Sequence, residues 1–228
     1  MTQITYHLAD IRKRVSVALR DAGRGAEHVM IVAVSKQHPP ECIAAAYRTG
    51  QSHFGESYVQ EALPKIERLR DLPIEWHYIG PIQANKTRAI AERFQWAHSV
   101  DRAKIAQRLS AQRPVHAPPL NVLIQANLAG EPQKAGAAPG AVLDLAKLIA
   151  RLPGLRLRGL MGVPPTHSTR AESASYFREL HGLQHELAAA GVLTDTLSMG
   201  MSDDFETAIA NGSTCIRIGT AIFGPRRK

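Results

Sequence analysis

Lys36 is the residue of this chain whose position most directly suggests chemistry. It follows the apolar run 29–35 and stands just before the His-Pro-Pro segment 38–40, which ends that run. A short apolar run of this kind is typical of a strand that is buried on both faces of a parallel sheet. Desolvation at the mouth of such a strand disfavours the ammonium form of a lysine and frees a nucleophilic amine. The alternative is a lysine that only extends its ammonium group into water.

Two glycine-containing segments further along the chain could bind a phosphate group. The segment 196–200 predicts a strand end that carries the hydroxyl of Ser198 and a glycine that permits close backbone approach. After the apolar run 215–218, Gly219 and Thr220 offer backbone N–H groups and a hydroxyl. In a (β/α)8 barrel the phosphate site commonly follows strands seven and eight, which is where these segments fall. The alternative is that they only form a turn and a helix cap.

Arg217 lies inside an apolar strand, between Ile216 and Ile218. Because side chains alternate along a strand, the arginine faces the opposite side from both isoleucines. A guanidinium inside a barrel needs an acceptor, either an acidic side chain or a ligand nitrogen, since an unpaired buried charge is costly. Together with Lys36 and the phosphate segments, Arg217 describes a pocket for pyridoxal 5′-phosphate (PLP), in which the amine condenses with the aldehyde and the arginine faces the ring nitrogen.

The elements that must position these residues alternate between strands and helices. Short apolar runs predict strands at 30–35, 52–54, 75–79, 96–100, 120–126, 156–160, 196–199 and 215–218. Helices are predicted at 39–49, 56–70, 84–94, 101–112, 139–151, 169–190 and 203–211, with an extra amphipathic N-terminal helix at 4–20. This alternation favours an α/β fold, a single (β/α)8 TIM barrel over residues 1–228. An open doubly wound sheet is the alternative, although no Gly-rich fingerprint follows the first predicted strand.

Composition and charge narrow the class of protein. Hydrophobic residues make up 44% of the 228 residues, which is enough for a sizeable core. No stretch reaches the ~18 uninterrupted apolar residues of a membrane helix, and the N-terminus does not resemble a signal peptide. The two cysteines, Cys42 and Cys215, lack metal-ligand spacing, so we expect a cytoplasmic protein without a metal site. The net charge of +8 is scattered along the chain, which makes specific nucleic-acid binding the weakest alternative.

Six segments in sequence order resemble motifs of the pyridoxal phosphate homeostasis proteins, which are single-domain relatives of the alanine racemase barrel. The segments are Ala33-Val34-Ser35-Lys36, His53-Phe54-Gly55-Glu56-Ser57-Tyr58-Val59-Gln60-Glu61, Glu75-Trp76-His77-Tyr78-Ile79-Gly80-Pro81-Ile82-Gln83-Ala84-Asn85-Lys86, Leu157-Arg158-Gly159-Leu160-Met161, Leu197-Ser198-Met199-Gly200-Met201-Ser202-Asp203 and Ile216-Arg217-Ile218-Gly219-Thr220-Ala221-Ile222-Phe223-Gly224. The resemblance covers nearly the whole chain. It implies a fold-type III PLP-binding barrel without the C-terminal β-domain of the racemases.

The resemblance also implies which residues bind the cofactor. Lys36 is expected to hold PLP as a Schiff base, the lysine aldimine. The other expected cofactor-binding residues are Ser57, His77, Met161, Ser198, Met199, Arg217, Gly219 and Thr220. Ser57 stands where the family usually has asparagine, and the loop 133–136 keeps the family's Lys134 and Gly136. For His77 the alternative is a satisfied core histidine, and for the two methionines it is a wall or gap-filling role.

The resemblance implies a PLP-binding protein that takes part in intracellular vitamin B6 homeostasis and is not an enzyme. Racemases of this barrel carry a second domain and take a tyrosine from a partner subunit, whereas this chain ends at Lys228. A cationic Arg217 also disfavours protonation of the cofactor's ring nitrogen, which weakens carbanion chemistry. The expected partners are PLP and PLP-dependent apo-enzymes, with the chain itself a monomer and not bound to membranes. The alternative is an amino-acid racemase that uses Lys36 as one base and, as the other, Tyr58, Tyr78 or His77.

Overall fold

Eight parallel strands form a closed barrel in the computed structural model, which describes residues 3–130 and 135–225. The strands follow one another around the barrel in sequence order, and β8 pairs with β1 to close it. Their bounds are β1 Met30–Val34, β2 His53–Glu56, β3 Glu75–Tyr78, β4 Trp96–Val100, β5 Leu120–Gln125, β6 Leu155–Met161, β7 Thr196–Ser198 and β8 Cys215–Ile218. The predicted (β/α)8 barrel is confirmed, because an open sheet would leave two strand edges unpaired.

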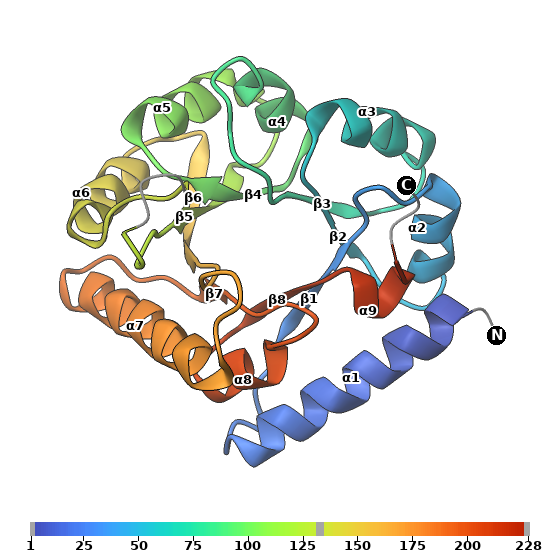
Figure 1. The fold of residues 1–228 in the computed structure, drawn as a ribbon. Helices are drawn as coiled ribbons and strands as arrows, with labels where there is room; N and C mark the ends of the chain where they lie inside the picture. The colour runs from blue at the N-terminus through green and yellow to red at the C-terminus, as the bar shows by residue number, and fades with distance from the viewer. Residues whose placement is uncertain (1–2, 131–134, 226–228) are drawn as a thin grey trace.

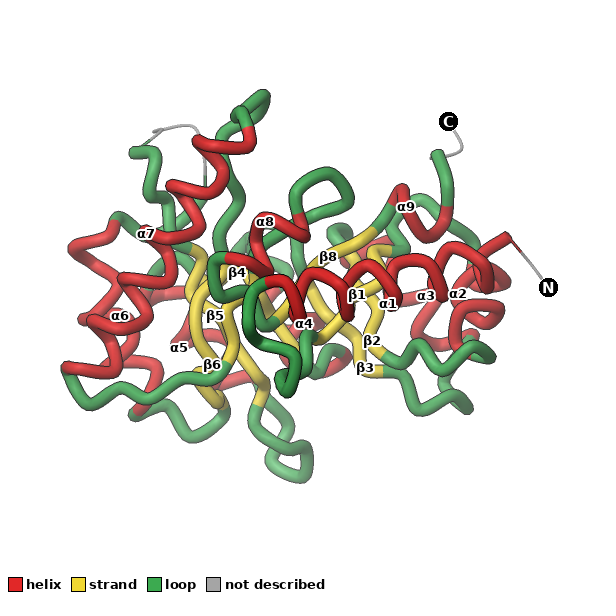
Figure 2. Tube along the Cα trace, turned by 90° about the horizontal axis from the view of Figure 1, so that it is seen from below, coloured by secondary structure: helices red, strands yellow, loops and turns green. Residues whose placement is uncertain are grey.

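Helices surround the barrel on its outside (Figure 1). Their bounds are α1 Gln3–Asp21, α2 Pro40–Tyr47, α3 Val59–Arg68, α4 Thr87–Arg93, α5 Ala103–Gln112, α6 Pro139–Ala150, α7 Arg170–Ala189, α8 Phe205–Ala210 and α9 Thr220–Phe223. Figure 2 shows the same elements from the side, with the helices flanking the strands. The sequence does not predict α9, because so few residues cannot show a helical period. The predicted strands agree well with those observed, and the second differs most, since it is displaced toward Glu56.

The N-terminal helix α1 packs against the elements at the other end of the sequence. Its buried residues repeat at helical spacing and are Leu8, Ile11, Val15 and Leu19. Figure 1 shows α1 along the outside of the barrel beside α8 and α9, with which it is in contact. His7 Nδ1 hydrogen-bonds the carbonyl oxygen of Ile222 at 2.9 Å, and Arg14 pairs with Glu206 at 2.5 Å. The first helix therefore covers the place where β8 meets β1.

The inside of the barrel carries polar as well as apolar side chains. Polar residues that are at most 6% exposed on β3, β4, β7 and β8 include His77, His98, Ser198 and Arg217. Three apolar residues form a cluster separate from the main core, namely Trp96, Leu123 and Met161. The main core lies instead between the barrel and its helices, where aliphatic side chains from both pack together.

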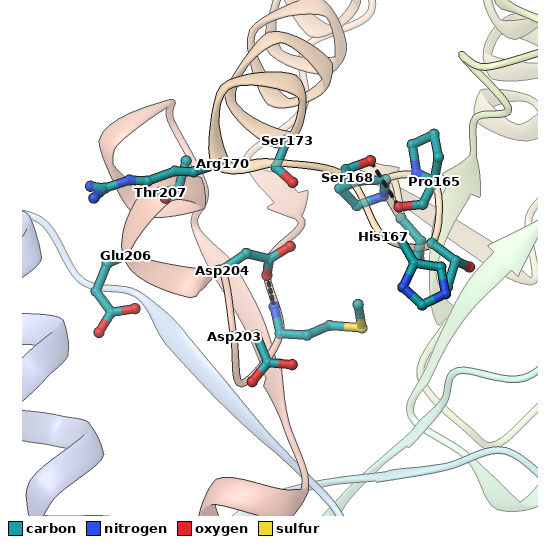
Figure 3. A pocket seen from close by; sticks show the side chains of 13 residues that line it. Pro165, His167, Ser168, Arg170, Ser173, Asp203, Asp204, Glu206 and Thr207 are labelled. Carbon is teal, nitrogen blue, oxygen red and sulfur yellow. Dashed lines mark hydrogen bonds between the residues drawn. The ribbon is translucent and has the colours of Figure 1, made fainter.

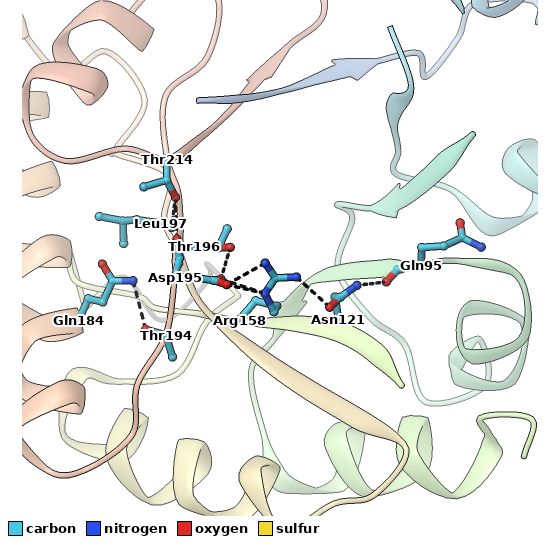
Figure 4. A network of polar contacts seen from close by, with 9 residues as sticks. All are labelled: Gln95, Asn121, Arg158, Gln184, Thr194, Asp195, Thr196, Leu197 and Thr214. Atoms are coloured by element: carbon cyan, nitrogen blue, oxygen red, sulfur yellow. Dashed lines mark hydrogen bonds and ion pairs between the residues drawn. The ribbon is translucent and has the colours of Figure 1, made fainter. Parts of the chain in front are cut away.

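A polar network around Arg158 joins neighbouring strands of the barrel (Figure 4). Arg158 donates hydrogen bonds to the carboxylate of Asp195 at 2.8–3.1 Å and to Asn121 Oδ1 at 3.2 Å. Its guanidinium carbon also lies 4.8 Å from the centroid of the Trp96 ring, within cation–π range. The network therefore ties β5 and β6 to the segment that leads into β7.

Two sequence-based expectations remain, namely the lack of a membrane-spanning helix and the family pattern in the loop 133–136. Within residues 3–130 and 135–225, none of the helices combines the length and the apolar character that a membrane crossing requires. Lys134, in the loop that resembles the family pattern, lies outside the described residues.

Candidate functional site

A cavity of about 250 Å³ lies at the C-terminal ends of β1, β3, β7 and β8. Its lining residues are Val34, Lys36, His38, Ile79, Met201, Ser202, Asp203, Arg217, Gly219 and Thr220. The structure thus brings together four of the residues that the sequence suggested for cofactor binding, namely Lys36, Arg217, Gly219 and Thr220. These residues come from opposite ends of the chain and meet because β8 pairs with β1.

Lys36 lies in a short loop that is held by one hydrogen bond before it and one after it. Before it, the hydroxyl of Ser35 donates to Glu56 Oε1 at 2.6 Å. After it, the N–H of Gln37 donates to Glu61 Oε1. Gln37 has a φ of 64°, in the left-handed region that side chains other than glycine rarely adopt. A strained backbone of this kind persists because the surrounding contacts fix it, so the position of Lys36 is set by its neighbours.

A buried ion cluster lies behind this loop. Lys65 Nζ donates to the carbonyl oxygen of Ser35 at 2.9 Å, to Glu56 Oε1 at 2.8 Å and to Glu61 Oε1 at 2.6 Å. Burial is the largest influence on Glu56 and raises the pKa of its carboxyl, while Lys65 opposes that rise. The second oxygen of Glu56 is buried and has no hydrogen-bond partner among the described residues. The cluster is therefore held by Lys65 at a desolvation cost to the carboxylate.

Arg217 enters the cavity from the inside of the barrel and is 6% exposed. Its Nη1 donates to the carbonyl oxygen and to the hydroxyl of Ser198, at 2.8 and 2.7 Å, and its Nη2 donates to the carbonyl oxygen of Gly162 at 3.1 Å. Within the described part of the chain, none of the hydrogen bonds that Arg217 donates goes to a carboxylate. Of the two acceptors that the sequence left open, an acidic side chain is thus not the one observed. The guanidinium keeps its charge for a ligand, because arginine stays protonated in proteins.

Hydrogen-bonding groups from the segments after β7 and β8 form one side of the cavity. Gly219 precedes Thr220 at the start of α9, and a Cβ atom on Gly219 would lie 3.4 Å from the carbonyl oxygen of Val34. Ser202 Oγ accepts a hydrogen bond from the N–H of Ala221 at 3.4 Å, which joins the two segments. Two hydroxyls and a closely approaching backbone therefore share a cavity with a lysine, an arrangement that suits an anion such as phosphate.

Five predicted cofactor residues do not line this cavity. They are Ser57, His77, Met161, Ser198 and Met199, of which Ser57 is the most exposed at 9%. The hydroxyl of Ser198 contacts His98 and Arg217 inside the barrel, and Ser202 supplies a serine hydroxyl to the cavity in its place. His77 lies deeper in the barrel between two other histidines, in keeping with the alternative of a satisfied core histidine. Whether these five residues contact the cofactor stays a prediction, because they lie outside the lining of this cavity and the cofactor's own contacts decide it.

His38 is a lining residue that sequence reasoning missed. It follows Lys36 by two positions, is 7% exposed, and stacks on Phe223 of α9 with ring centroids 5.1 Å apart. Its place directly before two prolines suggested only the end of a strand. The signal that was available is its place two positions after Lys36, in the loop that follows β1 at the C-terminal end of the barrel, where binding residues of this fold gather.

A larger cavity of about 810 Å³ adjoins the first and shares Met201 and Asp203 with it. Figure 3 shows that its carboxylates come from the segment after β7 and its opposite side from the loop after β6. Asp204 accepts a hydrogen bond from the N–H of Met201 at 2.6 Å, and Glu206 pairs with Arg14. Despite its size this cavity contains neither a lysine nor a buried arginine, so the smaller one is the candidate cofactor site.

Comparison with known proteins identifies the class of barrel and then the family. The family model of the alanine racemase N-terminal domain matches residues 6–227, so the fold and the site define a barrel of that class. The pyridoxal phosphate homeostasis protein of Pseudomonas aeruginosa is 51% identical over 226 residues, which cover 99% of this chain and 97% of the relative. That of Escherichia coli K12 is 48% identical and covers 99% and 98%. The chain belongs to the family of pyridoxal phosphate homeostasis proteins.

Solved structures agree with this assignment. PipY of Synechococcus elongatus, with PLP bound, is 37% identical with a TM-score of 0.86, and the match covers 97% of this chain and 100% of PipY. D-threonine aldolase from Filomicrobium marinum shares the fold with a TM-score of 0.71 at 20% identity. That match covers 92% of this chain but 59% of the aldolase, so the same barrel also occurs as part of longer enzymes.

Proposed function

We propose that this chain binds PLP in the cavity of Lys36 and takes part in controlling the supply of PLP in the cell, without catalysing a reaction. The observation that carries the proposal is the meeting of Lys36, Arg217 and Thr220 on one cavity of about 250 Å³. Such a cavity offers an amine for an aldehyde, a cation for a ring nitrogen and a hydroxyl for a phosphate. The names of the relatives and the PipY structure with PLP bound support the same conclusion.

Each lining residue has a separate task in this proposal. When bound, PLP supplies an aldehyde and an electron-accepting ring. The amine of Lys36 would bind the aldehyde covalently, with release of one water, and the ion cluster behind it holds the loop in place. The hydroxyls of Thr220 and Ser202, with the backbone at Gly219, hold the phosphate. Arg217 would face the ring nitrogen, since its hydrogen bonds to the protein go to neutral oxygens and leave its charge for a ligand.

The same contacts support a binding role rather than catalysis. A cation beside the ring nitrogen disfavours its protonation, and an unprotonated ring withdraws electrons less strongly. The residues that the sequence suggested as the second base of a racemase do not line the cavity, namely Tyr58, Tyr78 and His77. Tyr78 donates a hydrogen bond to the carbonyl oxygen of Pro81, and burial raises its pKa to about 12. A phenol with that pKa is poorly matched to proton transfer near neutral pH.

A racemase or a related enzyme is the second candidate, and His38 is the observation that favours it. His38 lines the cavity, and an imidazole is the commonest general base at neutral pH. The proposal of a non-catalytic protein therefore requires that His38 does not remove a proton from a bound amino acid. Isotope exchange at the amino acid's Cα separates the two functions.

Covalent mapping tests the binding proposal. The protein is incubated with PLP, reduced with borohydride and digested, and the labelled peptide is expected to contain Lys36. Lys36→Ala should lose the label, whereas Lys104→Ala, at an exposed position on α5, should keep it. Label on another of the eight lysines in the protein, with Lys36 unmodified, would overturn the assignment.

The remaining parts of the proposal concern where the protein acts and with what. We place it in the cytoplasm, in keeping with its free thiols Cys42 and Cys215. PLP-dependent apo-enzymes are the partners to which bound PLP would pass. We propose that the chain acts as a monomer, which sedimentation at micromolar concentration would test directly.

A further inference from the structure

A line of hydrogen bonds crosses the inside of the barrel and ends at Arg217. His53 Nδ1 lies 3.0 Å from His77 Nε2, and His77 Nδ1 lies 2.9 Å from His98 Nε2. His98 Nδ1 lies 3.0 Å from Ser198 Oγ, which accepts a hydrogen bond from Arg217 at 2.7 Å. The residues belong to β2, β3, β4, β7 and β8, so the line runs from one wall of the barrel to the other. We call the part from His53 to Ser198 the histidine chain.

The histidine chain has two possible directions. A neutral imidazole has one N–H donor and one acceptor nitrogen, so each ring that accepts on one side must donate on the other. In the forward direction the Ser198 hydroxyl donates to His98, His98 to His77, and His77 to His53. In the reverse direction each ring carries its proton on Nδ1 instead, and His98 donates to the hydroxyl oxygen of Ser198. Ser198 then donates its own proton elsewhere, and the thiol of Cys215 is within hydrogen-bonding reach of it.

The two ends of the histidine chain differ in their access to water. His77 and His98 are fully buried, and burial lowers the pKa of each well below its ordinary value. His53 is half-buried at the N-terminal end of β2 and lines a separate cavity of about 380 Å³. Burial and the nearby His28 also lower the pKa of His53, but this ring borders solvent. His53 is therefore the member of the chain that a proton from water reaches.

Charged groups surround His53 on several elements. Its own cavity is lined by Arg12 of α1 and by Glu27 and His28 of the segment before β1, and Glu75 is its neighbour on β3. Arg24 pairs with Glu27 and so offsets that carboxylate. Further inside, Trp96 stacks on His77 with ring centroids 5.2 Å apart and separates the chain from Arg158. The titratable groups that act on Arg217 are Cys215, Asp204 and Tyr176, of which Asp204 is the carboxylate.

We propose that the histidine chain transmits the protonation of His53 to the hydroxyl of Ser198 and thereby positions Arg217 in the cofactor cavity. A charged His53 has N–H groups on both nitrogens, so its Nδ1 must donate to His77, and this selects the reverse direction throughout. The change takes up one proton from water in total. The proton of each of the three rings moves from Nε2 to Nδ1, and the added proton occupies the Nε2 of His53 that this leaves free. The Ser198 oxygen then accepts from both His98 and Arg217, and the hydrogen bond to Arg217 weakens because two donors share one acceptor.

His53, His77, His98 and Ser198 are positioning residues in this scheme, because none of them lines the cavity. The last link, from Arg217 to the cofactor, rests on the proposed function. The relay itself is a property of the protein alone and can be measured without PLP.

Nitrogen NMR of the apo-protein, with ¹⁵N-labelled histidine rings, tests the relay. As pH falls through the titration of His53, the Nδ1 shift of His98 is expected to change from acceptor type to donor type. Its Nε2 shift should change from donor type to acceptor type, although His98 itself stays neutral. In His77→Gln, His53 should still titrate while His98 no longer responds, because an amide cannot redistribute its protons. In His53→Gln, at a half-buried strand end that tolerates substitution, the response of His98 should also vanish. His185→Gln, at an exposed position on α7, should behave as the unaltered protein does.

The outcomes separate the relay from the proposed function. A His98 signal that ignores the titration of His53, or that follows it equally in His77→Gln, overturns the relay. With PLP labelled at its ring nitrogen, the ¹⁵N shift should follow the same titration in the unaltered protein and lose that dependence in His77→Gln. If the shift is independent of pH while His98 responds, the positioning of Arg217 is wrong. If PLP does not bind at all, the proposed function fails, and the apo-protein result still decides the relay.

Discussion

The ammonium nitrogen of Lys65 lies 2.9 Å from the carbonyl oxygen of Ser35, the residue directly before Lys36. The same nitrogen pairs with Glu56 and Glu61. One buried lysine thus anchors the loop that presents another lysine to the cavity. Since Lys65 is 5% exposed and Glu56 is fully buried, neither charge has water as a substitute partner.

Lys65→Met is expected to destabilise the protein by about 3–5 kcal/mol, because it leaves Glu56 as a buried carboxylate without a cation. Urea unfolding followed by circular dichroism measures the change. Adding Glu56→Gln to Lys65→Met should recover part of the loss, since the uncompensated charge is then gone. Lys104→Met, at an exposed position, should stay within about 0.5 kcal/mol of the unaltered protein. Equal stability of both lysine variants would show that the ion cluster does not hold the loop.

The stability of the protein should fall as pH drops below about 6.5, with His77 and His98 as two of the causes. Their folded-state pKa values are lowered, so in the acidic range the unfolded chain binds protons that the folded protein does not. Stability is therefore complete above the ordinary histidine pKa and is lost as pH falls toward the lowered values. Each ring contributes up to about 1.4 kcal/mol per pH unit in that window.

Urea unfolding between pH of about 5 and 7.5 measures this slope. His98→Gln removes one titrating group. The slope of its unfolding free energy against pH should therefore correspond to about one bound proton fewer, whatever the substitution does to stability at neutral pH. His185→Gln is the control, because its ring is exposed on α7. An unchanged slope in His98→Gln would mean that this ring takes up a proton in the folded state as readily as in the unfolded one.

Thr220→Val should weaken PLP binding about tenfold, since a hydrogen bond to a charged group contributes ~1.5–3 kcal/mol and the backbone contacts remain. Thr220→Ser keeps the hydroxyl and should bind nearly as the unaltered protein does. Ser202→Ala is expected to have an effect of similar size, because both hydroxyls line the cavity. Fluorescence titration of the apo-protein gives the three affinities. If Thr220→Val and Ser202→Ala both bind normally, the phosphate lies at another part of the cavity.

The PLP-loaded protein should exchange the Cα proton of L- or D-alanine with deuterated water far more slowly than ~1 s⁻¹, the lower end of usual enzyme turnover. The reason is the charged Arg217, which disfavours a protonated ring nitrogen. Proton NMR follows the exchange. A rate of about 1 s⁻¹ or faster that disappears in both Lys36→Ala and His38→Gln would favour the racemase, with the two residues as its bases.

Much of the fold follows from local sequence patterns. Apolar runs located all eight strands, because strands in a parallel barrel are buried on both faces and carry little polar alternation. The same runs drew attention to four candidate site residues, because each of them interrupts or follows a run: Lys36, Arg217, Gly219 and Thr220. Four residues of α9 lack the length for a periodic signal and escaped prediction.

What the sequence does not reveal is pairing between residues that are far apart. Nothing local distinguishes Ser202, which lines the cavity, from Ser198, which supports Arg217, because the difference is the direction of each side chain at a strand end. The histidine chain was missed for a related reason. Its rings are not direct partners in the strand register, since His53 pairs with Glu75 and His77 with Trp96, so their contacts become visible only when the barrel's stagger is known.

The contact of α1 with α8 and α9 has a consequence for how the protein is made. His7 and Ile222 are partners although 215 positions separate them, so the ribosome must finish nearly the whole chain before they meet. At synthesis rates of about 5–20 residues per second, the apolar face of α1 waits for tens of seconds or less without its final cover. During that interval the apolar side chains of Leu8, Ile11, Val15 and Leu19 lack the cover that α8 and α9 give them in the folded protein. We therefore expect α1 to be a binding site for molecular chaperones until β8 has been made.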